Sequence, residues 1–249
     1  SFQVLAMQYT TLLLLAIGVT AAGSVKWTAQ NAAGKTCLIF SANSINAKLN
    51  ILNPDNVTET INFAINETQK VTGECNGKYG GFVANTLEVL FFPDGKLPEH
   101  ATDGQPWRLF MWFTLNPSAT TSFMLADYIL ETAPGSLFNS TTQNFTKSTS
   151  AELEFQATST NGFKCSTSGL ALSDDSTIDL KDTRVIAGAF LDQADFPETQ
   201  TFEQCQLDSR TSDIVPIVVG ACLAGLVVVV LVAYLVGRAR AKRQGYASV

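Results

Sequence analysis

The sequence predicts an all-β domain of antiparallel strands followed by one C-terminal transmembrane α-helix. Apolar runs rich in β-branched and aromatic residues alternate with turn residues, which is typical of β-sheet domains. An uncharged stretch of 23 residues, 214–236, lies close to the C-terminus. Four cysteines lie between residue 24 and that stretch. An even number of cysteines indicates disulfides when the chain folds in an oxidising compartment.

Residues 1–23 have the pattern of a secretory signal peptide. The apolar run 10–19 is too short to span a bilayer, and the small residues 20–24 follow it. No basic residue precedes the run, and the chain opens with Ser1 rather than methionine. We expect Met7 to be the initiator, residues 1–6 to be upstream read-through, and cleavage to occur near position 22 or 23.

The region 24–213 is predicted to be a luminal domain of two antiparallel sheets. A segment at 123–130 fits either a strand or a helix, and the pairs Asp94–Gly95 and Asn161–Gly162 are turn signals. The predicted strands are the runs 87–92, 107–113, 153–156 and 185–190.

The four luminal cysteines are interpreted as disulfide partners rather than metal ligands. They are Cys37, Cys75, Cys165 and Cys205. Three pairings are open, and the similar separations of 38 and 40 residues favour two sequential loops over crossed ones. The glycine-rich segment 73–81 is interpreted as a turn anchored by a disulfide. Cys222 lies within the membrane stretch, where we expect it to pack as a small apolar residue.

Four Asn-x-Ser/Thr sequences lie on the luminal side of the predicted topology, where asparagine can be glycosylated. Two of them fall in the Ser/Thr-rich stretch 139–150, and together they predict a glycosylated surface. The acceptors are Asn56, Asn66, Asn139 and Asn144.

The second apolar stretch predicts a transmembrane helix at 214–237, in contact with the lipid bilayer. Four basic residues follow it, so the positive-inside rule places the tail 238–249 in the cytosol. Two overlapping pairs of small residues would let another helix approach closely, although ordinary small residues in a lone span explain the same pattern. These pairs are Gly220 with Ala224 and Ala221 with Gly225.

The luminal region offers no convergent catalytic set. The chain has one histidine, His100, in a polar loop context, and the pair Asp174–Asp175 is interpreted as a hydrated turn. Metal-ligand spacings and nucleotide-binding motifs do not occur in the sequence. All 22 acidic residues precede position 214, and an acidic body repels nucleic acid. We therefore expect no enzyme, no cofactor, no metal and no nucleic-acid partner.

The C-terminal residues have the spacing of a tyrosine-based sorting signal. Tyr246 is followed three positions later by the apolar Val249, with Gly245 in front. Such a pair binds in an extended conformation, with each side chain in its own pocket. The expected partners are clathrin adaptor complexes.

The chain resembles the lysosome-associated membrane glycoprotein family. The resemblance is densest at 205–208, 214–220, 223–227, 233–238 and 245–246, and weaker at 34–40, 48–51 and 162–165. It implies a β-prism luminal domain with two sequential disulfides and a location in lysosomal and late-endosomal membranes. It also implies that glycosylated domains coat the inner face of the membrane and that adaptors read the tail.

The sequence departs from the longer members in having one luminal domain and no Pro-rich hinge. The expected function is a non-enzymatic glycoprotein that coats and organises the lysosomal membrane. The alternative is a trafficking cofactor that binds another membrane protein and escorts it. The chain would reach lysosomes either directly or by way of the cell surface.

Overall fold

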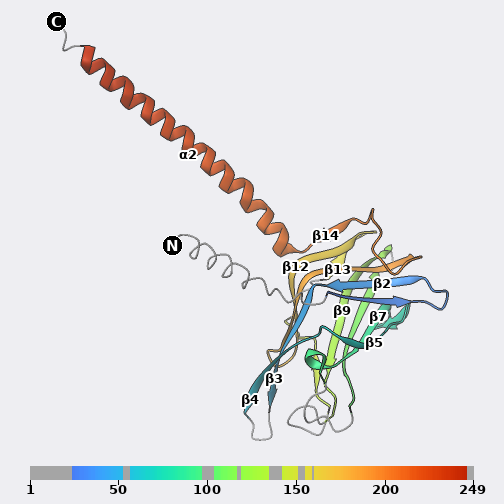
Figure 1. Ribbon diagram of the computed structural model, residues 1–249. Coiled ribbons are helices and arrows are strands. Elements are labelled where there is room, and N and C mark those ends of the chain that lie inside the picture. The colour runs from blue at the N-terminus through green and yellow to red at the C-terminus, as the bar shows by residue number, and fades with distance from the viewer. Residues whose placement is uncertain are drawn as a thin grey trace, which may run out of the picture. The chain divides into compact units, whose positions relative to one another are not determined.

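A computed structural model describes residues 24–52, 57–96, 104–116, 119–134, 142–150, 155–158 and 160–245 of the chain (Figure 1). The predicted signal peptide, 1–23, lies outside the described residues. The chain divides into two compact units, Ser1–Glu203 and Gln204–Val249. The first unit consists of β-strands, and the second is dominated by one long helix.

The first sheet contains seven described strands, and β1, β2, β3, β4, β12 and β13 are joined by antiparallel pairing. Its central path runs in the order β1, β2, β13, β12 and β14, and β3 pairs with both β13 and β4. The strands are β1 (Val25–Gln30), β2 (Thr36–Ala42), β3 (Ser44–Leu52), β4 (Thr58–Ala64), β12 (Gly162–Ala171), β13 (Thr177–Leu191) and β14 (Phe202–Gln204).

The second sheet also contains seven described strands in antiparallel pairing. Its path runs in the order β10, β9, β8, β7 and β5, with β11 paired to β9 and β6 paired to β7. The strands are β5 (Thr68–Thr72), β6 (Gly77–Tyr79), β7 (Phe82–Phe91), β8 (Trp107–Asn116), β9 (Ala119–Glu131), β10 (Asn144–Thr146) and β11 (Gln156–Ala157).

The long strand β13 pairs with two different strands, β3 and β2, along the same edge. Residues 177–181 pair with β3, whereas residues from Arg184 onward pair with β2. Between the two segments Asp182 has φ of 49°, in the left-handed region. Its carboxylate accepts a 2.8 Å hydrogen bond from the side-chain amide of Asn43, in the connection between β2 and β3. The strained residue therefore marks the point where the sheet changes partner.

The core lies between the facing sides of the two sheets, with β13 against β8 and β9, and with β1 and β2 against β7. Alternate residues of β8, beginning with Trp107, are buried, as expected for strands with one side on a core. Aromatic side chains fill much of this space: the ring centroids of Phe63 and Trp107 lie 5.1 Å apart, and those of Trp27 and Phe40 lie 5.2 Å apart. Burial of this apolar surface is the main force that holds the sheets together.

The predicted all-β class with antiparallel sheets is confirmed. The runs 87–92, 107–113 and 185–190 lie in β7, β8 and β13, apart from Phe92, which follows β7. The ambiguous segment 123–130 lies within the strand β9. Of the run 153–156, residues 153 and 154 lie outside the described residues, and Gln156 begins β11. The pair Asp94–Gly95 forms a tight turn, η1 (Pro93–Gly95).

The second unit contains α2 (Gln206–Gly245), a helix of 40 residues that spans about 60 Å at 1.5 Å per residue. Its segment Ile217–Arg240 is long and apolar enough to cross a membrane, with a mean hydropathy of 2.8. The helix begins eight residues before the predicted span, 214–237, and continues through the basic residues that follow it. The apolar run thus locates the membrane segment, whereas the helix itself extends beyond that segment at both ends.

Candidate functional site

The disulfide Cys37–Cys75 joins the two sheets. Cys37 lies in β2 and is buried, and Cys75 precedes β6, with 5.9 Å between the two Cα atoms. Asn85, buried in β7, donates from its side-chain amide to the carbonyl of Cys37 at 3.2 Å. The backbone N–H of Asn76 donates to the side-chain oxygen of Asn85 at 2.8 Å. The glycine-rich segment is thus anchored by its disulfide, as predicted, and Asn85 is a partner that the sequence did not suggest.

The remaining luminal cysteines, Cys165 and Cys205, are also disulfide-bonded. Cys222 in α2 is the free cysteine, and it is exposed on the surface of the helix. With Cys37 and Cys75 joined to each other, the two luminal pairs are sequential along the chain. The predicted order of the disulfides is confirmed.

Two of the four predicted glycan acceptors lie within the described residues, and both are exposed. Asn66 lies in the connection between β4 and β5, and Asn144 is the first residue of β10. Because β5 and β10 end the central path of the second sheet, the two asparagines lie at opposite edges of it. Asn56 and Asn139 fall outside the described residues.

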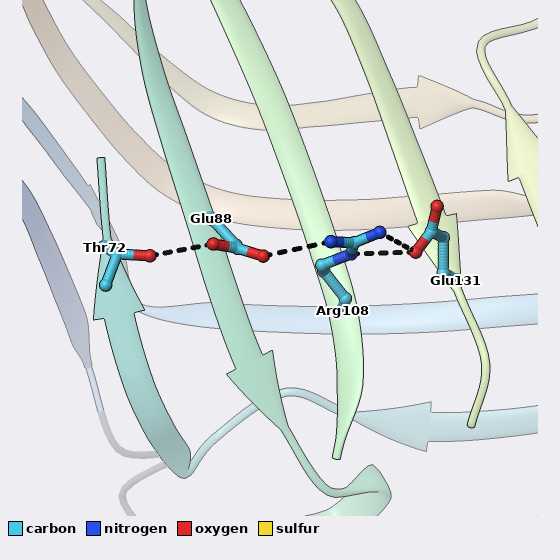
Figure 2. A network of polar contacts seen from close by, with 4 residues as sticks. All are labelled: Thr72, Glu88, Arg108 and Glu131. Carbon is cyan, nitrogen blue, oxygen red and sulfur yellow. Dashed lines mark hydrogen bonds and ion pairs between the residues drawn. The ribbon is translucent and has the colours of Figure 1, made fainter. Parts of the chain in front are cut away.

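A row of charged side chains crosses the outer face of the second sheet, which is the face directed away from the core (Figure 2). Arg108 of β8 donates to Glu131 of β9 through Nε at 2.8 Å and also through its terminal NH2. On its other side Arg108 pairs with Glu88 of β7 at 3.2 Å, and Glu88 accepts from the hydroxyl of Thr72 in β5 at 2.9 Å. The hydrogen bond to Glu131 contributes most to the raised pKa of Arg108. Four neighbouring strands are thereby linked by side chains as well as by backbone pairing.

Beside this row, the same face carries three aromatic side chains that are only half-buried. The ring centroids of Phe110 and Trp112 lie 4.2 Å apart, and those of Trp112 and Tyr79 lie 5.3 Å apart. The hydroxyl of Tyr79 donates to the carboxylate of Asp127. This hydrogen bond, together with burial and the negative charge of Asp127, raises the pKa of Tyr79 to about 12. The phenol therefore stays protonated at any physiological pH, and its ring is held against Trp112.

Glu203 in β14 holds the loop that leads into β12. Its carboxylate accepts hydrogen bonds from the backbone N–H of Thr158 and from the side-chain amide of Asn161, both at 2.9 Å, and from the hydroxyl of Thr158. Partial burial raises the pKa of Glu203, but these hydrogen bonds outweigh that effect, and the net pKa lies below the ordinary 4.5. The carboxylate is therefore ionised in a mildly acidic lumen.

Replacing Glu203 with glutamine is expected to change how stability depends on pH. A carboxylate with a lowered folded-state pKa stabilises the fold fully above its ordinary pKa of 4.5 and loses that contribution as pH falls through the lowered value. The stability difference between wild type and E203Q should thus be constant from neutral pH to about pH 5 and shrink below that. Thermal unfolding of the purified chain across this range measures it. A difference that grows on acidification would contradict the assignment.

The pair Asp174–Asp175, predicted to be a hydrated turn, forms an exposed turn between β12 and β13. Both residues have φ in the left-handed region, at 57° and 52°. Their backbone carbonyls each accept a 3.1 Å hydrogen bond from the side-chain amide of Asn50. Both aspartates thus shape the hairpin, as predicted. His100 lies outside the described residues.

The membrane helix exposes the small residues that the sequence singled out. A Cβ added at Gly220 or at Gly225 would meet nothing within 4 Å, apart from the helix's own backbone and adjacent residues. Of the predicted sorting signal, Gly245 is the last residue of α2, and Tyr246 and Val249 lie outside the described residues.

The chain is similar to known lysosomal membrane glycoproteins in both sequence and fold. A family model described as lysosome-associated membrane glycoprotein 2, transmembrane segment, matches residues 215–247. Lysosome-associated membrane glycoprotein 1 of Bos taurus is 32% identical over 216 residues, which is 86% of this chain and 46% of that protein. The protein of the same name from Gallus gallus is 33% identical over 138 residues, covering 55% of this chain and 31% of that protein. The chain thus spans less than half the length of these relatives.

Among solved structures, the membrane-proximal domain of mouse lysosome-associated membrane protein 1 has the same fold. The TM-score is 0.54 at 22% sequence identity, and the match covers 74% of this chain and 98% of that domain.

Proposed function

This chain belongs to the lysosome-associated membrane glycoprotein family, and from that premise we propose that it is a non-enzymatic glycoprotein that coats and organises the lysosomal and late-endosomal membrane. A luminal β domain followed by one apolar C-terminal helix fits a single-pass lysosomal membrane protein. The observation that carries the coating role is the position of the two described acceptors, Asn66 and Asn144. Both are exposed, at opposite edges of one sheet, so their glycans would shield two different sides of the domain.

Delivery to this membrane is assigned to the tail. Tyr246 and Val249 have the spacing of a signal that clathrin adaptors bind as an extended segment. The tail follows the basic end of α2, so the positive-inside rule places it in the cytosol, where adaptors act. Adaptor complexes are thus the proposed cytosolic partners.

A second candidate function, escort of another membrane protein, is favoured by the open faces of α2. With a small residue at each of four positions, the backbone of the helix is accessible to a neighbouring helix, and this is how transmembrane helices come close enough to associate. The four positions are Gly220, Ala221, Ala224 and Gly225. The coating role needs no such partner, so the two functions can be separated.

One experiment distinguishes the two functions in cells that lack the chain. Three forms of the chain are expressed separately in these cells. They are the wild type, a variant with all four acceptor asparagines changed to glutamine, and a variant with the four small helix residues changed to leucine. The coating proposal predicts that the glycan-free variant fails to restore resistance of the lysosomal membrane to leakage, whereas the helix variant succeeds. A stoichiometric membrane partner, captured in mild detergent with wild type and lost from the helix variant, would support escort. Full protection by the glycan-free variant would refute the coating role.

A further inference from the structure

We propose that the glycan on Asn144 folds back over the outer face of the second sheet and packs on Phe110 and Trp112. The inference rests on the proposed glycosylation and adds the surface that the carbohydrate occupies. It assigns an occupant to the aromatic strip formed by Phe110 and Trp112, which are only half-buried among the described residues.

The strand register places Asn144 on the same face as the strip. Asn144 is paired with Glu131 of β9, and Glu131 is paired with Arg108 of β8. Directly opposed residues of antiparallel strands point to the same side of a sheet. The next residue of β10, Phe145, is buried in the core, which confirms that the exposed Asn144 points outward. A glycan on Asn144 therefore emerges at the end of the charged row shown in Figure 2.

The strip has the chemistry that carbohydrate binds. Phe110 and Trp112 are half-buried on the outer face of the sheet, and the hydroxyl of Tyr79 donates to Asp127, so that the Tyr79 ring is held beside Trp112. A sugar ring has one face of C–H groups, which carry the partial positive charge that the face of an aromatic ring attracts. Aromatic surface left half-exposed on a sheet is stabilised when such a group covers it.

The charged row supplies the polar half of the same site. Glu88 and Glu131 are hydrogen-bond acceptors, and the guanidinium of Arg108 is a donor, all on the outer face next to Phe110. The hydroxyl and acetamido groups on the rim of an N-linked sugar need partners of both kinds. The charged row and the aromatic strip therefore match the two sides of one amphipathic ligand.

The glycan can reach the strip without any change in the fold. Asn144 shares its row with Arg108, two strand spacings or about 10 Å away across the sheet. Phe110 and Trp112 follow Arg108 by two and four residues along β8, so they lie about 12 and 17 Å from Asn144. An N-linked chain that extends beyond its first two sugar rings covers both side chains. A second copy of the protein fits this face less well. The glycan attached at its edge would clash with the second copy, and the charged side chains of the row would be desolvated.

The natural tryptophans give a direct test. The protein contains three: Trp27 and Trp107 are 2% and 1% exposed, and Trp112 is the half-buried one on the outer face. Quenching of tryptophan fluorescence by acrylamide therefore reports mainly on Trp112. The full chain, produced in glycosylating cells and purified in detergent, is expected to show stronger quenching once the Asn144 glycan is removed by N144Q or T146A.

Matched variants make the result specific. T146S keeps the glycosylation sequence and should behave as wild type, and N66Q removes a glycan at the opposite edge and should leave quenching unchanged. W112F should abolish the difference between chains with and without the Asn144 glycan. Mass spectrometry of the Asn144 peptide establishes occupancy in each sample.

The possible results distinguish a failure of this inference from a failure of the proposed glycosylation of Asn144. If Asn144 is occupied and quenching is the same in wild type, N144Q and T146A, the glycan does not cover the strip and the inference is wrong. If Asn144 carries no glycan, both the inference and the proposed glycosylation of this site fail. Protection of Trp112 that appears only at concentrations where two copies associate, measured by light scattering, would assign the face to a second copy and overturn the proposal.

Discussion

Replacing Tyr246 with alanine is expected to move most of the protein from lysosomes to the cell surface. The change removes one of the two side chains by which an extended tail segment would occupy an adaptor's pockets. Loss of an aromatic anchor costs about 2 kcal/mol or more, which is roughly a 30-fold weaker complex. Surface biotinylation and imaging against a lysosomal marker measure the shift, and adaptor binding to the tail peptide measures its cause.

Two further tail variants make this result interpretable. V249A removes the second anchor and should have a similar effect, whereas S248A changes a residue between the anchors and should leave sorting intact. The basic residues before the signal remain in all three variants, so membrane topology is unchanged. If Y246A reaches lysosomes as efficiently as wild type and by the same route, the tail does not carry the sorting signal.

The strands that could be predicted are those with strong apolar content. The runs 87–92, 107–113 and 185–190 of β7, β8 and β13 are rich in β-branched and aromatic side chains and predict strands, whereas the segment 123–130 of β9 fits a helix equally well. The strand β3 lies outside the predicted strands because half of its residues are polar, although its buried residues Ile45, Ala47, Leu49 and Ile51 alternate with polar ones. That period of two was a usable signal of a half-buried strand. The strand β4 has mostly exposed polar residues and gives no such signal.

The outer face of the second sheet could not be predicted from the sequence. Glu88, Arg108 and Glu131 are about 20 residues apart along the chain, and only the strand register brings them into one row. A slip of one residue between β8 and β9 would turn Glu131 into the core. The sequence identified Asn144 as a glycan acceptor, but not which face it occupies, because this follows from its pairing with Glu131.

Removing the disulfide Cys37–Cys75 is expected to cause the largest loss of stability among the changes considered. The bond closes a loop with a sequence separation of 38 residues. On the chain-entropy estimate, opening such a loop lowers the free energy of unfolding by about 4 kcal/mol. Domains of this kind are stable by about 5–15 kcal/mol in total, so the expected loss is a large fraction. The double variant C37A/C75A avoids leaving a single buried thiol.

Thermal unfolding of the purified full chain tests this prediction, with C222S as the matched control. Cys222 is free and exposed on α2, so its replacement should leave the unfolding of the β domain unchanged. For a domain of this size, a loss of about 4 kcal/mol lowers Tm by about 8–16 °C. A shift of about 2 °C or less would mean that the hydrogen bonds of Asn85 to Cys37 and Asn76 hold the two sheets together without the covalent bond. The combined variant C37A/C75A/N85A would then lose the stability that C37A/C75A retained. In that variant neither the disulfide nor the hydrogen bonds of Asn85 would link the two sheets.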